Sequence, residues 1–214
     1  MRVKICGIKK VEDALKAIEY GADAIGLLVG QTHASKDFIS KELAKEIVDS
    51  LPPFVSTVMV THMTDVQTII DFASFIGVST IQLHGESNIN DIRQIKNELR
   101  NVKIVKSIHV VDESSIYTGA EFLGYADAVL LDTMNKGTDQ IGGTGITHDW
   151  NISKMIVESY KIPIILAGGL NPDNIEEAVN KVKPYAVDVN SGVKGEDGFK
   201  DYEKLKKFIQ KAKK

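Results

Sequence analysis

The chain reads ILAGGLNPDN at residues 165–174 and YAVDVNSGVKG at residues 185–195. Each segment is an apolar run rich in Ile and Val, which a turn of small residues interrupts and a helical pattern follows. Backbone N–H groups at Gly168-Gly169 and Ser191-Gly192 can approach an anion closely, because glycine carries no side chain that would block them. A helix that begins after such a turn adds the positive end of its dipole. The two segments therefore predict either a phosphate site or two turns that need glycine only for tight geometry.

An alternation of apolar runs and amphipathic segments recurs along the whole chain. Strand-like runs begin near Val3, Ala24, Ser56, Thr80, Lys103, Ala128, Pro163 and Tyr185. Amphipathic segments with helical spacing lie between them, at residues 11–20, 41–50, 65–76, 89–99, 113–122, 152–160, 174–182 and 198–213. The runs AIGLLV (24–29) and DAVLLD (127–132) are almost continuously apolar, as in parallel strands buried on both faces.

Such β-then-α units, spaced roughly 25 residues apart, leave little room for a domain boundary or a disordered linker. A doubly wound open sheet is the rival architecture, but it predicts a dinucleotide fingerprint that the sequence lacks. The sequence therefore predicts an α/β protein with a single (β/α)8 TIM barrel over residues 1–214.

Composition excludes several functional classes. The 214 residues are 43% hydrophobic and 26% charged, with a formal net charge of −3. This balance shows no basic excess for binding nucleic acid, and no apolar stretch reaches the roughly 18 residues of a membrane span. Met1 leads into a strand rather than a signal peptide, and the single cysteine cannot form an internal disulfide. We therefore expect a cytoplasmic protein with no nucleic-acid or membrane partner.

In a (β/α)8 barrel, catalytic groups lie at the C-terminal ends of the strands. The only cysteine, Cys6, ends the first strand-like run, and Asp132 ends the sixth. All five histidines map to the same end of the barrel: His33, His62, His84, His109 and His148. For any one of them, a solvated loop histidine is the simpler interpretation. Together they favour a functional site.

Several motifs, at their proper places along the chain, carry a strong resemblance to phosphoribosylanthranilate isomerase of tryptophan biosynthesis. They are KICGI (4–8), EDALKAIEYGADAIG (12–26), IQLHGE (81–86), VLLDT (129–133), GGTG (142–145), ILAGGLNPDN (165–174) and VDVNSGV (187–193). The resemblance covers all the units in order. It implies a (β/α)8 barrel without a cofactor that catalyses an Amadori rearrangement. The substrate class is an N-(5-phosphoribosyl) aminoaldose, and the product is a 1-deoxyribulose aminoketose.

The resemblance also implies roles for individual residues. Cys6 matches the family's general base, and Asp132 matches its general acid. A carboxyl acid needs a raised pKa to be protonated at neutral pH, which burial at a strand end supplies. A thiol with an ordinary pKa of about 8.5 is only slightly ionised at pH 7, so a nearby cation would help it act as a base. Lys4 projects to the same side of its strand as Cys6 and is one candidate for that cation; a barrel-interior residue without a direct role is the other interpretation.

Substrate-binding residues follow from the same motifs. Backbone amides of Gly168, Gly169, Ser191 and Gly192 are predicted to hold the phosphate of a phosphorylated small molecule. Gly143 and Gly145 belong to GGTG, which resembles the family's flexible sixth loop and would help to enclose the substrate. His84 belongs to the QLHG motif, and Asp188 matches an aspartate that lines the site or supports it.

The chain departs from the family after the second strand. The family usually carries an arginine there, which pairs with the anthranilate carboxylate, and alignment on FIS (38–40) puts Asp37 in its place. Lys36 lies one residue earlier and is predicted to bind the carboxylate as a point charge, without the bidentate fork of arginine. Asp37 itself would repel the carboxylate.

The histidines open further alternatives, since His33, His62, His109 and His148 are not part of the family's usual pattern. Two or three of them, with Asp37 or Asp149, could bind Zn²⁺ or another divalent metal, although no H-x-H or H-E-x-x-H spacing occurs. Protonated histidines could instead replace the arginine.

Four functions remain open at this point. They are the isomerase, a paralogue that isomerises another phosphosugar amine, a metal-dependent phosphosugar epimerase or lyase, and a non-catalytic metabolite-binding barrel. The fold alone separates none of them. The presence of both the acid and the base argues against the non-catalytic barrel. The sequence pattern does not give the oligomeric state.

Overall fold

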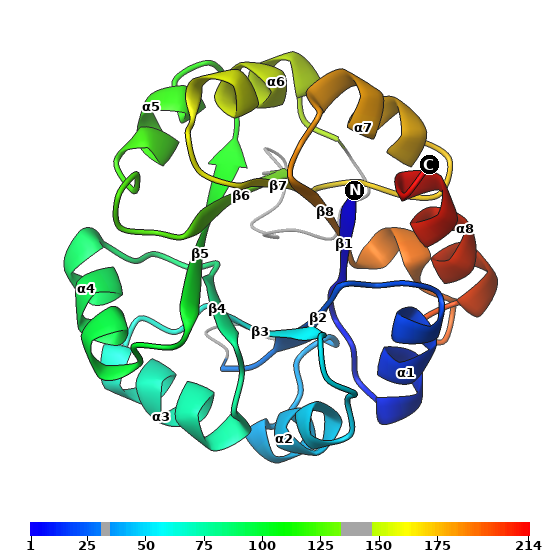
Figure 1. Cartoon of the computed structure of the whole chain (residues 1–214), viewed down its shortest axis with the longest axis horizontal. Helices are drawn as coiled ribbons and strands as arrows, with labels where there is room; N and C mark the ends of the chain where they lie inside the picture. Colours follow the sequence, from blue (N-terminus) through cyan, green and yellow to red (C-terminus); the bar gives the residue numbers. More distant parts are fainter. Residues whose placement is uncertain (31–34, 134–146) are drawn as a thin grey trace.

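The computed structural model describes residues 1–30, 35–133 and 147–214. Eight parallel strands close into a barrel in chain order, with β8 paired to β1 (Figure 1). The strands are β1 (Arg2–Ile5), β2 (Ala24–Leu28), β3 (Ser56–Thr61), β4 (Thr80–Leu83), β5 (Lys103–Val110), β6 (Ala128–Thr133), β7 (Ile164–Leu166) and β8 (Ala186–Val189). The predicted (β/α)8 barrel is therefore confirmed.

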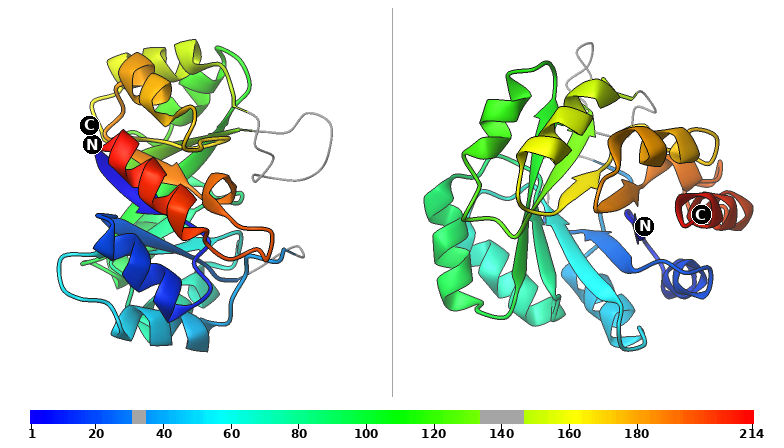
Figure 2. Two further views of the ribbon diagram at one scale, coloured as in Figure 1. Left: turned by 90° about the vertical axis from the view of Figure 1, so that its right-hand side faces the viewer. Right: turned by 45° about the horizontal axis from the view of Figure 1, so that its top comes forward.

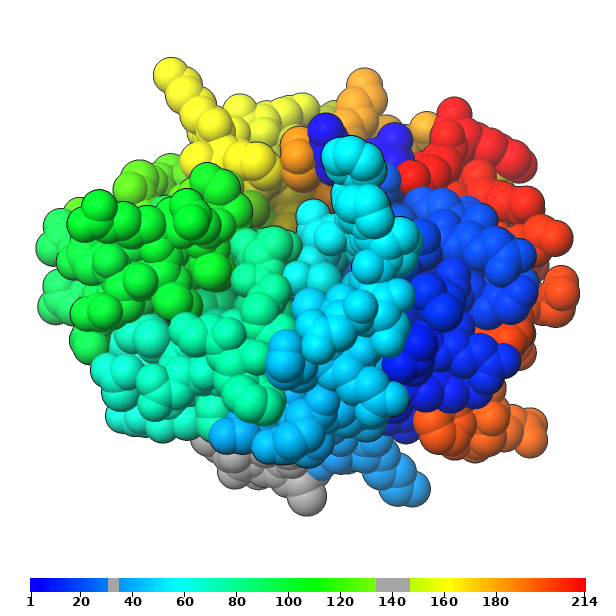
Figure 3. Space-filling view, turned by 60° about the horizontal axis from the view of Figure 1, so that its bottom comes forward, coloured from blue at the N-terminus to red at the C-terminus, as the bar shows by residue number. Residues whose placement is uncertain are grey.

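Helices form an outer ring around the barrel (Figure 1). They are α1 (Val11–Glu19), α2 (Lys41–Asp49), α3 (Val66–Ile76), α4 (Ile89–Glu98), α5 (Ser115–Ala120), α6 (Trp150–Ser159), α7 (Ile175–Val182) and α8 (Tyr202–Ala212), with a short 3₁₀ turn, η1 (Ser191–Val193), after β8. In Figure 3 the first half of the chain, from blue to green, covers one side of the molecule continuously, and the last helix flanks it in red.

Helix α3 illustrates why these segments become helices. The Asp65 side chain accepts a hydrogen bond from the Thr68 amide at 2.8 Å, which caps the N-terminus. Gly77 ends the helix with a φ of 79°, a left-handed conformation that costs glycine little. Between them, the residues that face the barrel are apolar and buried: Ile69, Ile70, Ala73 and Ile76. Burial of each large aliphatic side chain stabilises the fold by about 1.5–3 kcal/mol.

The strands of the barrel separate the apolar core into an outer part and an inner part. The largest cluster lies between the strands and the helices, with fully buried residues such as Ile81 and Phe208. Two smaller clusters lie inside the barrel, around Val60 and Leu130. Buried polar side chains from β1, β4, β5 and β8 also lie inside: Lys4, Gln82, Ser107 and Asp188. Most of the stability thus comes from the outer layer, which leaves the interior available for polar groups.

The last helix begins later than the sequence predicts, at Tyr202 instead of residue 198. Gly198 has a φ of 78°, and Lys194 and Lys200 pair in an antiparallel bridge, so residues before Asp201 form a loop. Asp201 then caps the helix by accepting from the amides of Glu203 and Lys204. This correction matters because it places Lys200 in a loop beside the site, paired with Lys194.

The chain ends lie together at one end of the barrel, and the C-terminal strand ends face the other way (Figure 2). None of the helices in the three described ranges has both the length and the apolar composition that a membrane crossing requires.

Candidate active site

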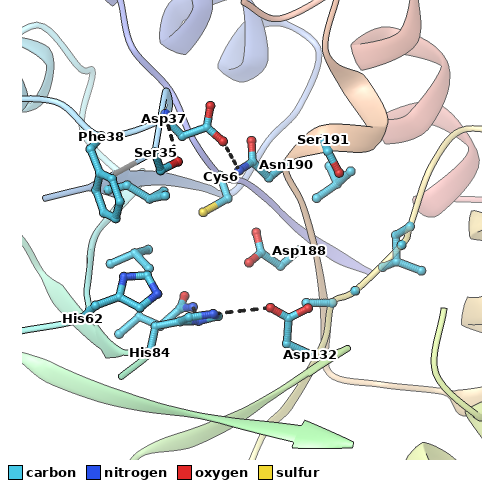
Figure 4. A pocket seen from close by; sticks show the side chains of 18 residues that line it. Cys6, Ser35, Asp37, Phe38, His62, His84, Asp132, Asp188, Asn190 and Ser191 are labelled. Carbon is cyan, nitrogen blue, oxygen red and sulfur yellow. Dashed lines mark hydrogen bonds and ion pairs between the residues drawn. The ribbon is translucent and has the colours of Figure 1, made fainter. Parts of the chain in front are cut away.

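A pocket opens at the C-terminal ends of the strands, as in other barrels of this kind. Its lining comes from β2, β3, β4, β6 and β8 and from the segments that follow β1, β2, β3, β4, β7 and β8. Cys6, His84, Asp132 and Asp188 all face it (Figure 4). The pocket therefore brings together the predicted base, the predicted acid and two of the predicted binding residues.

Cys6 lies directly beyond β1, where its thiol is buried. Its sulfur and the Lys4 side chain both pack against Gly26 of β2, where a Cβ atom would come within 2.9 Å of each. The Lys4 ammonium donates to Asp188 Oδ2 at 2.8 Å and to Gln82 Oε1 at 2.9 Å. Burial raises the pKa of Cys6 to about 11, against the opposing effect of the Lys4 charge. Cys6 is therefore a neutral thiol in the free protein at pH 7.

Lys4 is charged despite its burial. Burial alone would lower the pKa of Lys4, but Asp188 and Cys6 outweigh this effect and raise it. Burial raises the pKa of Asp188, although Lys4 opposes the shift. Asp188 Oδ1 has no hydrogen-bond partner among the described residues and belongs to the pocket lining. An unpartnered buried oxygen of this kind is suited to accept a hydrogen bond from a ligand.

Asp132 lies in β6, one residue before its end. Its Oδ1 accepts from the Thr133 amide at 2.8 Å, and its Oδ2 lies 3.5 Å from His84 Nε2. Burial raises the pKa of Asp132, while the Thr133 hydrogen bond and the neighbouring histidines oppose the rise. This is the environment that a general acid needs, because it favours the protonated carboxyl group.

A network of hydrogen bonds runs between these groups across the barrel interior. Gln82 Nε2 donates to Ser107 Oγ at 3.1 Å and lies 3.3 Å from His84 Nδ1. Because Gln82 also accepts from Lys4, one chain of contacts links the surroundings of Cys6 with those of Asp132. The network fixes the relative positions of the acid and the base.

The turn after β7 and the turn after β8, where the sequence predicts a phosphate site, lie side by side. The amides of Gly168, Gly169 and Ser191 face the same pocket and donate no hydrogen bond to any described group. Gly168 has a φ of 77°, and a Cβ atom there would lie 2.2 Å from Thr133 Oγ1. A Cβ atom on Gly192 would lie 2.0 Å from the Leu170 carbonyl oxygen, so Gly192 allows the two turns to pack together. Gly192 itself is outside the pocket lining.

The opposite side of the pocket is apolar and aromatic. It consists of Leu28, Phe38, Val60 and His62, which we call the aromatic half, whereas the cradle of Gly168, Gly169 and Ser191 is the phosphate half. The rings of Phe38 and His62 meet edge to face, with centroids 5.7 Å apart. Flat apolar walls of this type suit an aromatic ring.

Asp37 lines the pocket next to the aromatic half. Two residues of the segment after β8 bind its carboxylate. Its carboxylate is ion-paired with Lys194 and accepts from Asn190 Nδ2 at 3.0 Å. Lys200 Nζ in turn donates to Asn190 Oδ1 at 3.0 Å. Burial would raise the pKa of Asp37, but the hydrogen bond and charge of Lys194 outweigh this effect and lower it. We call Asp37, Asn190, Lys194 and Lys200 the Asp37 cluster.

Other predicted residues lie away from the pocket or outside the described residues. Lys36 is exposed and is not part of the lining, and its carbonyl accepts from Lys9. His148 bonds to Thr133 and Ser153 behind the site, and burial lowers its pKa to about 4. The ring of His109 meets that of His84 edge to face, but His109 does not line the pocket. His33, Gly143 and Gly145 lie outside the described residues.

Sequence reasoning missed several residues of the site. Gln82 was detectable, because it alternates with His84 and must face the same side of its strand. Gly26 carries no such signal, since its role is to leave room for Lys4 and Cys6. Lys200 was placed in the predicted last helix and Lys194 was given no role, and only the loop that precedes α8 brings them to Asn190 and Asp37.

Two of the histidines, His62 and His84, lie close to one another. The ring centroids of His62 and His84 are 4.9 Å apart. In residues 1–30, 35–133 and 147–214, no group of three or more His, Cys, Asp or Glu side chains is arranged to hold a metal ion.

Comparisons with known proteins agree with this geometry. Residues 3–211 match the family model of N-(5'-phosphoribosyl)anthranilate (PRA) isomerase. The chain is 45% identical over 213 residues to "N-(5'-phosphoribosyl)anthranilate isomerase 2" of Methanosarcina mazei, which covers 100% of this chain and 94% of the relative.

Solved structures show the same relationship. The phosphoribosyl anthranilate isomerase of Thermotoga maritima superposes with a TM-score of 0.88 at 37% identity, covering 100% of this chain and 98% of that one. A second structure, a phosphoribosyl anthranilate isomerase bound to reduced 1-(o-carboxyphenylamino)-1-deoxyribulose 5-phosphate, gives a TM-score of 0.85 at 36% identity with the same coverage. The chain therefore belongs to the N-(5'-phosphoribosyl)anthranilate isomerase family.

Proposed function

We propose that the protein isomerises N-(5'-phosphoribosyl)anthranilate to the 1-deoxyribulose 5-phosphate aminoketose, with Asp132 as general acid and Cys6 as general base. The observation that carries the assignment of roles is a buried carboxyl group and a buried thiol in one pocket, beside three backbone amides that donate to no described group. Family membership supports the reaction, and the chemistry of the pocket supports the roles.

The substrate binds with its phosphate in the phosphate half and its ring in the aromatic half. Three amides, those of Gly168, Gly169 and Ser191, donate to the phosphate oxygens. The ring packs against Phe38, and the ribose then lies across the middle of the pocket between Cys6 and Asp132. Asp188 Oδ1 accepts a hydrogen bond from a ribose hydroxyl, which gives this buried oxygen a partner.

Asp132 starts the reaction by donating its proton to the furanose ring oxygen. The bond between C1 and the ring oxygen breaks, and the nitrogen lone pair forms a protonated Schiff base. Because burial raises the pKa of Asp132, its protonated form is favoured, and this form supplies the proton that the ring oxygen takes.

Cys6 becomes a base only after this step. With a pKa of about 11, roughly one thiol in ten thousand is ionised at pH 7. The new positive charge on the Schiff base favours the thiolate, and the thiol proton passes to the ionised Asp132 by way of Asp188, which lies between them in the view of Figure 4. The thiolate then removes the proton from C2. The resulting enolamine tautomerises to the ketone, so both groups end in their starting protonation states.

The single cysteine has a defined role as a free thiol in this scheme. A reducing compartment keeps it in that form. We accordingly propose that the enzyme works in the cytoplasm.

A continuous fluorescence assay with substrate generated in situ tests the function. Wild-type protein should turn the substrate over, and Asp132→Asn and Cys6→Ser should each lower kcat/KM by about 10²–10⁴-fold. Phe54→Ala, which changes an exposed side chain far from Cys6, is the matched control and should retain wild-type activity. Absence of turnover in the folded wild-type protein would refute the proposed substrate, and full activity of either variant would refute its assigned role.

A further inference from the structure

We propose that Lys194, positioned by Asp37, binds the carboxylate of the aromatic amine and makes the site selective for a carboxylated ring. This inference rests on the isomerase function proposed above and extends it to a specificity-determining residue outside the barrel strands. It answers a difficulty that the sequence raises, because an acidic side chain alone at the pocket edge would repel a carboxylate.

The position of Lys194 is defined by contacts on both its backbone and its side chain. Its backbone pairs with Lys200 in an antiparallel bridge, and its carbonyl accepts from Lys204 Nζ at 2.9 Å. Its ammonium group contacts both carboxylate oxygens of Asp37, and the side chain is only 19% exposed. A lysine held in this way loses little further conformational entropy when a ligand binds.

The Asp37 cluster carries a net positive charge at neutral pH. Asp37 is ionised, since its pKa is lowered, and Lys194 is its ion-pair partner. Burial lowers the pKa of Lys200 to about 8, so this second ammonium group is mostly protonated at pH 7. Two cations against one anion leave an excess of one positive charge beside the aromatic half. The cluster therefore attracts an anion even though its central residue is acidic.

Lys194 also has one N–H donor that Asp37 does not engage. An ammonium group has three N–H donors, and the two oxygens of Asp37 engage two of them. Asp37 and Asn190 line the pocket next to Phe38, so a ring that packs on Phe38 presents its ortho substituents to this edge. A carboxylate at that position can accept the remaining hydrogen bond from Lys194.

His62 offers a competing explanation for carboxylate binding. It lines the same half of the pocket and packs against Phe38. Its ring is buried against the rings of Phe38 and His84, whereas Lys194 already pairs with a carboxylate, that of Asp37. The observed carboxylate contact thus favours Lys194, and the experiment below distinguishes the two.

Isothermal titration calorimetry with two ligands tests the inference. The first is reduced 1-(o-carboxyphenylamino)-1-deoxyribulose 5-phosphate, and the second is the same molecule without the carboxylate. Wild-type protein should prefer the first ligand by about 10- to 100-fold, the range of a hydrogen bond to a charged group. Lys194→Met should abolish the preference and leave the affinity for the second ligand unchanged.

Further variants separate charge from structure. Asp37→Asn/Lys194→Met removes both charges, and it should also show no preference if Lys194 supplies the contact. Asp37→Asn alone should keep the preference, because the amide still accepts a hydrogen bond from Lys194. Lys45→Met, which removes a lysine paired with Asp49 on the outside of α2, is the matched control and should behave as wild type. In steady-state kinetics, Lys194→Met should raise KM about 10- to 100-fold and change kcat little.

Two results would overturn the inference. One is a preference that survives Lys194→Met, especially if His62→Phe then removes it. The other is an equal loss of affinity for both ligands, which would indicate a structural role only. Neither result touches the isomerase function, provided that the wild type turns over the substrate. A folded wild type that neither turns it over nor binds either ligand would refute the isomerase proposal, and this inference with it.

Discussion

The phosphate half of the pocket uses backbone amides, whereas the aromatic half uses side chains. In the phosphate half, Gly168 and Gly169 have positive φ angles of 77° and 68°, and their N–H groups are the proposed binding groups. In the aromatic half, Phe38 and His62 make the surface, and Asp37 is held by Lys194 and Asn190 from a distant segment. A backbone site depends on a few glycines, while a side-chain site can be rebuilt by many combinations of residues. The second half is therefore where members of one family can diverge.

The largest effect is expected at Gly168. A Cβ atom there would lie 2.2 Å from Thr133 Oγ1 and 3.0 Å from Asp132 Oδ1, so Gly168→Ala should displace both the amide cradle and the acid. We expect kcat/KM to fall by about 100-fold or more, as misplacement of reacting groups by about 1 Å does elsewhere. Gly77→Ala provides the control, because its φ is 79° and nothing lies within 4 Å of the added atom. Equal activity of the two variants would mean that the cradle is not built as described.

The second prediction concerns the ionisation of the Cys6 thiol and its dependence on pH. Because the pKa of its buried thiol is about 11, the thiolate fraction should rise about tenfold per pH unit from pH 7 to 9.5. Alkylation by iodoacetamide in the absence of ligand should follow the same slope, whereas an ordinary thiol near pKa 8.5 levels off within this range. The measurement is the rate of mass increase, with Cys6→Ser as the unreactive control. A plateau below pH 9 would show that Lys4 outweighs burial and that the thiolate is already formed in the free enzyme.

The smallest effect is expected in the aromatic half. Phe38→Ala removes one wall of the ring site, so KM for the isomerase substrate should rise about 5- to 10-fold, in line with the loss of an aromatic contact of about 1 kcal/mol. The inhibition constant of ribulose 5-phosphate, which lacks the ring, should not change. Phe54→Ala should alter neither value. A parallel loss of affinity for ribulose 5-phosphate would show that the two halves are not independent.

The two halves also differ in how far the sequence predicts them. The glycine turns of the proposed phosphate half could be located from ILAGGLNPDN and VDVNSGV, because positive φ angles and close backbone approach require glycine at particular positions. The order of strands followed from hydrophobic periodicity, and Cys6 and Asp132 followed from their place at strand ends. These features depend on local sequence.

The aromatic half depends on contacts between segments that are far apart in the chain. Lys36 was predicted to face the carboxylate because it is adjacent to Asp37, but it is exposed, and Lys194 contacts Asp37 instead. No local pattern shows that residues 157 positions apart form an ion pair. Residues 198–201 of the loop before α8 were also predicted as helix, which concealed the approach of Lys200 to Asn190.

A crystal structure of the protein with reduced 1-(o-carboxyphenylamino)-1-deoxyribulose 5-phosphate tests the central claim most directly, because one ligand spans both halves. We predict phosphate oxygens about 3 Å from the amide nitrogens of Gly169 and Ser191. We also predict the ribulose C2 beside Cys6 Sγ and the carboxylate on Lys194 Nζ. A ligand bound in the reverse direction, with its phosphate against Phe38 or its ring on the glycine cradle, would contradict the account.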